Sequence, residues 1–159
     1  VLGLDYLSGT SLDDSDDRSF VPLYGTNHKF YGLMDYFYVG NTHGQTIYNS
    51  GLADVYVKAR FNLSDRSNLM AHAHYFSSPA TIYDPLDLTE TESPFLGTEI
   101  DLVYLMNVLD DLNFYIGYSH MFQSNTLEVI KGDIQDPAPV QNWAWMMIAF
   151  KPELFRSGQ

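Results

Sequence analysis

The side chains best suited to chemistry are charged residues and histidines that recur at alternate positions of short segments. In an extended strand, side chains two residues apart share one face. Such a face could form a charged channel wall in which acids hold basic side chains in position for a passing anion. The alternative is an ordinary polar face whose charges contact water and pair weakly. The residues concerned are Asp54, Lys58, Arg60, His72, His74, Glu99 and Asp101.

His72 and His74 also have the spacing of a metal site carried by one strand. A third ligand, such as His120 or Glu99, would be needed to complete it. No further ligand motif accompanies the two histidines, so we expect two polar wall residues and no resident metal.

Two loop features could also bind ligands. A long segment without alternation carries Tyr24, His28, Lys29 and Asp35, which could contact a sugar acid at a channel mouth or simply hydrogen-bond the loop in place. The acidic run at residues 13–17 has the oxygen chemistry that Ca²⁺ prefers. It lacks the glycine and distal glutamate of an EF-hand. We expect a solvated charge run with no cofactor, loop-bound calcium being the alternative.

Composition narrows the function classes. The 159 residues include no cysteine, which excludes thiol nucleophiles and cysteine-ligated zinc. A net charge of −12 argues against nucleic-acid binding. No nucleophile elbow, phosphate loop or Ser/His/Asp pattern is present, so we expect no enzyme. The 15% aromatic content is too high for an acidic disordered chain, and these rings need an apolar environment.

The elements that must position these residues are predicted to be strands, because apolar and polar residues alternate in segments of about ten residues. One segment places Lys58 and Arg60 opposite an apolar face, and the range 32–38 stays ambiguous. Six strands are predicted: 2–8, 53–62, 69–77, 98–108, 112–123 and 143–151.

The connections alternate between tight polar turns, at 63–68 and 109–111, and long segments, at 9–51, 78–95 and 124–140. Transmembrane β-barrels have this rhythm of short periplasmic turns and long external loops. A cation on the lipid face costs about 2–4 kcal/mol at mid-membrane, which fixes Lys58 and Arg60 on the inner face. Interfacial girdles are expected from Tyr36, Phe37, Tyr38, Tyr75, Tyr104, Phe114, Tyr115 and Phe150.

Five stretches distributed along most of the chain share a further feature: 20–35, 51–56, 96–101, 117–122 and 142–145. They resemble the alginate-export family of outer-membrane β-barrels. The resemblance implies an all-β, antiparallel barrel of about 18 strands, of which residues 1–155 would form the last six and 156–159 a tail. It also implies a channel for an anionic polysaccharide in the outer membrane of a Gram-negative bacterium. Expected partners are membrane lipid, lipopolysaccharide and the N-terminal strands of the same barrel.

Three alternatives remain open from the sequence. The same barrel could serve as a general porin for small polar solutes. The chain could instead be a soluble β-barrel or sandwich that binds a ligand, because a wet sheet face gives the same alternation. A barrel that acts as a structural subunit of a larger envelope complex is the third.

Overall fold

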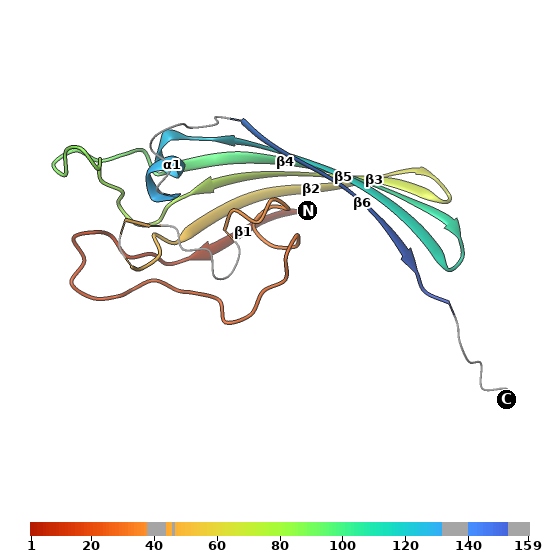
Figure 1. Ribbon diagram of the computed structural model, residues 1–159, viewed down its shortest axis with the longest axis horizontal. Helices are drawn as coiled ribbons and strands as arrows, with labels where there is room; N and C mark the ends of the chain where they lie inside the picture. The colour runs from red at the N-terminus through yellow and green to blue at the C-terminus, as the bar shows by residue number, and fades with distance from the viewer. Residues whose placement is uncertain (38–43, 46, 132–139, 153–159) are drawn as a thin grey trace.

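The computed structural model describes residues 1–37, 44–45, 47–131 and 140–152. In these ranges the chain forms one antiparallel sheet whose six strands follow sequence order (Figure 1). The sheet is not closed, so β1 and β6 form its two edges. The elements are β1 (Leu2–Leu7), β2 (Leu52–Ser64), β3 (Ser67–Ser77), β4 (Phe95–Leu109), β5 (Leu112–Gln123), α1 (Asn125–Lys131) and β6 (Val140–Phe150).

The six predicted strands are confirmed, with bounds that differ by a few residues. Residues 32–37 form turns and bends rather than a strand, while Tyr38 and the predicted tail at 156–159 lie outside the described residues. No helix of the described part of the chain is long and apolar enough to cross a membrane.

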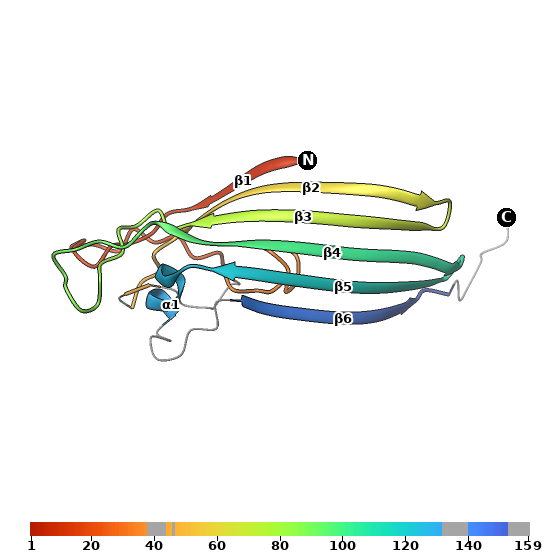
Figure 2. The same ribbon diagram turned by 90° about the horizontal axis from the view of Figure 1, so that it is seen from above.

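Short and long connections lie at opposite ends of the sheet, as Figure 2 shows. The β2–β3 and β4–β5 turns are at one end, and the long segments with α1 are at the other. The Ser64 and Ser67 hydroxyls are 2.8 Å apart across the first turn. The expected rhythm of connections is therefore present in the structure.

The prediction that 124–140 is only a loop was wrong, because α1 forms at its start. The Ser124 hydroxyl caps this helix by accepting the Leu127 N–H at 3.3 Å. Leu127 and Ile130 are three residues apart and buried. A seven-residue helix spans two turns, which is too short for its periodicity to stand out in the sequence.

The two faces of the sheet differ sharply. We call the concave face, under which the β1–β2 connection passes, the inner face, and the opposite one the outer face (Figure 1). The strand pairing gives the outer face a largely apolar surface with many exposed side chains, among them Leu4, Val55, Val57, Phe61, Tyr75, Leu102, Ile116, Phe122, Met146, Ile148 and Phe150.

Aromatic residues lie toward both ends of this outer face. Tyr75 stacks on Phe95 near the long connections, with ring centroids 4.9 Å apart, and Phe114 and Phe150 lie near the short turns. The girdle prediction was wrong for Phe37, which is buried in the core, and for Tyr115, whose pairing places it on the inner face. Tyr36 lies in the loop beneath the sheet and packs against that core.

The hydrophobic core lies on the inner face at the end with the long connections. Side chains from the strands, α1 and the long loops meet there. The β1–β2 connection is thereby packed against the sheet, although it has no regular secondary structure in its described residues. The core consists of Phe37, Leu52, Phe76, Ile82, Leu96, Met121, Leu127 and Ile130.

Candidate functional site

Strand register places the predicted wall residues side by side on the inner face. Lys58 pairs with His72, and His72 pairs with Asp101, across β2, β3 and β4. One row further along, His74 pairs with Glu99. Because residues of equal parity share a face, Asp54 and Arg60 lie on the same side. All seven predicted residues are therefore on the face that the long loop covers.

A buried polar cluster lies in the middle of this face. The Nδ1 atom of His74 is 3.0 and 2.9 Å from the two carboxylate oxygens of Asp54. Nδ1 must carry a proton to make these contacts, so the remaining ring nitrogen, Nε2, faces the other way. Nε2 lies 3.8 Å from Asp101 Oδ2. All three side chains are buried, so His74 is fixed between two carboxyl groups.

Ser119 extends the cluster to β5. Its hydroxyl donates to Asp101 Oδ1 at 2.6 Å, whereas Asp101 Oδ2 is buried without a hydrogen-bond partner. Ser119 could not be predicted from the sequence, because serine occurs on both faces of strands. Its pairing with Asp101 could be identified only from the β4–β5 register.

Glu99 anchors the long loop to the sheet. Its Oε1 atom accepts the backbone N–H groups of Leu33 at 2.6 Å and Met34 at 2.9 Å. Gly32 lies so close that a Cβ atom there would be 2.5 Å from Glu99 Oε2, and its φ of 84° is in the glycine-favoured region. A carboxyl group on β4 therefore holds the loop backbone directly.

We call residues 28–37 the inner segment. His28 Nδ1 lies 2.9 Å from the Leu33 carbonyl and 3.0 Å from Asp35 Oδ2, and the His28 ring stacks on Trp143 with centroids 4.3 Å apart. His28, Tyr31 and Asp35 all have positive φ angles of 57–59°. Non-glycine residues adopt this conformation at a cost of about 1–3 kcal/mol each, and only where surrounding contacts hold them.

The four predicted mouth residues separate into two pairs. His28 and Asp35 contact each other, since the Asp35 carboxylate also accepts the His28 backbone N–H at 2.7 Å. Tyr24, in contrast, is 91% exposed, and the Lys29 amine lies 5.1 Å from the Phe30 ring centroid. His28 and Asp35 therefore stabilise the segment, whereas Tyr24 and Lys29 present their side chains to solvent.

The sequence left open whether inner-face acids hold Lys58 and Arg60 in position. Neither cation forms an ion pair with any of the residues that the structure describes. The Lys58 amine lies 4.5 Å from the Tyr56 ring centroid. The acids instead contact His74, Ser119 and the loop backbone, because these groups reach them in the buried part of the sheet.

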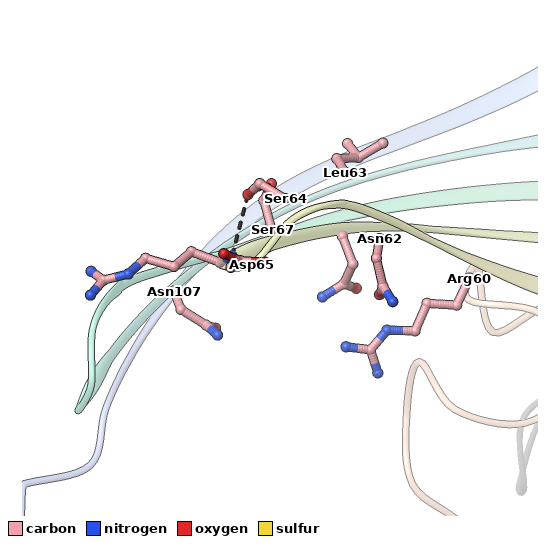
Figure 3. A pocket seen from close by; sticks show the side chains of 9 residues that line it. Arg60, Asn62, Leu63, Ser64, Asp65, Ser67 and Asn107 are labelled. Carbon is pink, nitrogen blue, oxygen red and sulfur yellow. Dashed lines mark hydrogen bonds between the residues drawn. The ribbon is translucent and has the colours of Figure 1, made fainter.

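Arg60 lines an open pocket of about 400 Å³ at the end with the short turns (Figure 3). The pocket is polar and holds two arginines, Arg60 and Arg66, with several amide side chains. Figure 3 shows the Arg60 side chain projecting from the strand ribbon on the same side as Asn62. The amide residues are Asn62, Asn68 and Asn107.

The acidic loop residues mostly hydrogen-bond their own loops. Asp17 Oδ1 accepts the Ser19 backbone N–H at 2.8 Å and its hydroxyl at 2.6 Å, and Asp14 accepts the Ser11 backbone N–H. Asp87 binds Thr89 in the same way. These hydrogen bonds lower the pKa of the Asp17 and Asp87 carboxyl groups. Such contacts are typical of Asx turns, so the cluster has a structural role.

Two titratable groups flank the packed loop. The Lys131 amine, at the end of α1, donates to the Tyr36 carbonyl and lies 5.7 Å from the Phe37 ring centroid. Burial lowers the pKa of Lys131 to about 8. Burial, followed by the charge of Glu99, raises the pKa of the Tyr36 hydroxyl to about 12.

The contribution of Lys131 to the stability of the folded protein should therefore rise from pH 8 to about pH 10. In that window an unfolded chain still binds the Lys131 proton that the folded chain has released. Above pH 10 the unfolded chain loses the Tyr36 proton first, so stability falls again. Lys131→Met should abolish the rise, which is at most about 3 kcal/mol. Unfolding free energies measured against pH test this, with the exposed Lys151→Met as control; a rise that persists in Lys131→Met would contradict it.

Comparisons with known proteins add no relative to this description. No family model, curated protein or solved structure matches the chain.

Proposed function

We propose that this chain forms part of the wall of an outer-membrane channel of the alginate-export type, which passes an anionic polysaccharide or small polar solutes. The observation that carries the proposal is the separation of chemistry between the two sheet faces. The outer face is apolar and exposed, whereas the inner face holds the charges and the packed loop. A membrane channel needs this combination of a lipid-facing surface and a polar lumen.

The outer face supports lipid contact over water contact. Soluble monomers rarely expose a continuous apolar surface larger than a few hundred Å². Phe122 and Phe114, near opposite ends of β5, are eight residues apart and span about 27 Å along the strand. At the 35–45° tilt of barrel strands this length spans about 19–22 Å of membrane thickness, slightly less than the apolar band of about 25 Å between two aromatic girdles.

The free edges of the sheet support a larger barrel. A lipid environment offers no water to the unpaired backbone groups of β1 and β6, so further strands must pair with both edges. About 18 strands in total would agree with the family that the sequence resembles. The long connections would then face the lipopolysaccharide on the external side.

The inner segment would narrow such a channel from within. It is fixed to β4 through Glu99 and to β6 through the stacking of His28 on Trp143. Toward the opposite end, Lys58, Arg60 and Arg66 offer positive charge without strong partners among the described residues. Cations without ion-pair partners attract an anionic chain without retaining it.

Single-channel conductance of the complete protein in planar bilayers tests the proposal. We expect polyuronate to block the current and a neutral oligosaccharide of equal length to leave it unchanged. Arg60→Gln should weaken the block several-fold, because it removes one unpaired cation of the inner face. Arg18→Gln, a change at an exposed loop cation near Asp14, should have no effect. A conducting channel that is indifferent to polyuronate would favour a general porin, and a protein that never conducts would contradict both.

A further inference from the structure

We propose that His72, His74 and Asp101 bind a divalent transition-metal ion of the zinc class on the inner face of the sheet. The site would link β3 to β4 beneath the inner segment. It is independent of the channel proposal, because the same three residues would hold a metal in any protein with this sheet.

The positions of the three residues follow from strand pairing. His72 and Asp101 are directly opposed on neighbouring strands, and His74 is two residues along β3 on the same face. Their ligand atoms all lie within 4.8 Å of one another. In a tetrahedral zinc site, bonds of about 2.0–2.2 Å separate the ligand atoms by about 3.4 Å. A small rotation of the half-buried His72 ring would close most of the difference.

The orientation of His74 is the one that metal sites require. Nδ1 faces the Asp54 carboxylate, so in the neutral ring the proton is on Nδ1 and the lone pair of Nε2 is directed toward Asp101. Metal-bound histidines usually donate their second ring N–H to a carboxylate in this manner, which fixes the tautomer and the ring plane. Asp54 would therefore act as a positioning residue rather than a ligand.

When His74 is neutral, the space between His74 and Asp101 contains no positive charge. The separation of 3.8 Å between Nε2 and Oδ2 is too long for a hydrogen bond. Asp101 Oδ2 is buried without a partner, while Oδ1 is already bound by Ser119. A buried carboxylate oxygen needs a proton, a cation or a donor to offset its desolvation. A metal ion supplies that charge and satisfies both facing atoms.

The charges around the cluster also favour a cation. Asp54 and Asp101 contribute two carboxylates, both buried. Lys58, which pairs with His72, is the opposing charge, but its amine lies over the Tyr56 ring. The sequence suggested His120 as a possible third ligand. Its pairing with Ile100 places it on the outer face, so it cannot be one. The Oε1 atom of Glu99 already accepts two backbone N–H groups.

The test is Zn²⁺ binding by the complete protein without a histidine tag, stripped of metal by a chelator and kept in detergent. We expect one Zn²⁺ per chain by calorimetry. His72→Ala and Asp101→Asn should each weaken binding at least tenfold. Asp54→Asn should weaken it about 10–100-fold and shift the visible spectrum of bound Co²⁺, since the His74 ring would lose its fixed orientation. His120→Ala, which removes a histidine from the opposite face, is the matched control and should bind as the unmodified protein does.

Lys58→Met is a further variant whose expected result, tighter Zn²⁺ binding, cannot arise from a failure to fold. It leaves every proposed ligand in place and removes the nearby positive charge, so Zn²⁺ affinity should increase several-fold. Absence of saturable Zn²⁺ binding to the unmodified protein would overturn the proposal. An unchanged Zn²⁺ affinity of His72→Ala would also overturn it. A protonated His74 paired with Asp54 and Asp101 would then account for the cluster.

Discussion

Leu102→Arg should destabilise the protein in a bilayer by about 2–4 kcal/mol, because it places a cation in the middle of the lipid-facing surface. Leu102 is 40% exposed on the outer face and lies in a row with Ala71 and Tyr118. This row is about midway between the two aromatic bands. Unfolding by urea in vesicles, measured for the complete protein, gives the change in the free energy of unfolding.

Met147→Arg provides the matched control for this prediction. Met147 is 46% exposed, but its pairing with Tyr115 places it on the inner face. An arginine there would contact the water of the lumen and should cost less than about 1 kcal/mol. If the sheet belonged to a soluble protein, its outer face would contact water, and Leu102→Arg would cost as little as Met147→Arg. Equal and small effects of both substitutions would contradict the membrane assignment.

Glu99→Ala should release the inner segment from the sheet. The substitution removes the acceptor of two backbone N–H groups, at Leu33 and Met34, and leaving a buried donor without a partner costs about 1–3 kcal/mol. The positive φ angles of His28, Tyr31 and Asp35 add strain that these contacts offset. We expect hydrogen exchange at Leu33 and Met34 to accelerate by at least tenfold. Trp143 fluorescence should change, because the His28 ring would no longer stack on the Trp143 indole.

Two further variants make the Glu99 result specific. Glu99→Gln keeps a carbonyl oxygen at the position of Oε1, so most of the protection should remain. Gly32→Ala disrupts the same contact from the loop side, because the added Cβ atom would clash with the Glu99 carboxylate. It should reproduce the effect of Glu99→Ala. Unchanged exchange in Glu99→Ala would contradict the role of Glu99 as the loop anchor.

The strands and their faces could be predicted because both depend on local alternation. Lys58 and Arg60 flank Ala59 in a segment whose other face is apolar, and a one-residue slip would reverse both faces. Pairing in sequence order then placed Asp54, His72 and Asp101 together, as expected for strands joined by tight turns or long loops.

The contacts between distant residues could not be predicted, because they depend on register and loop path. Nothing in the sequence shows that Glu99 binds the backbone of Leu33, 66 residues away. His120 looked like a candidate ligand, but the strand pairing turns it to the outer face. Phe37 looked like an interfacial residue, yet it packs against Phe76 in the core with ring centroids 4.8 Å apart.

The central claim is that the outer face meets lipid and the inner face lines a polar lumen. These 159 residues contain no cysteine, so single cysteine substitutions on β4 allow spin labels to be attached one at a time once any cysteine elsewhere in the complete protein is replaced. Electron paramagnetic resonance of the complete protein in vesicles then compares collisions with oxygen and with a water-soluble nickel complex. Labels at Ile100, Leu102 and Tyr104 should be accessible to oxygen and shielded from nickel. Nickel accessibility at these three positions equal to that of a label at exposed Tyr24 would contradict the account.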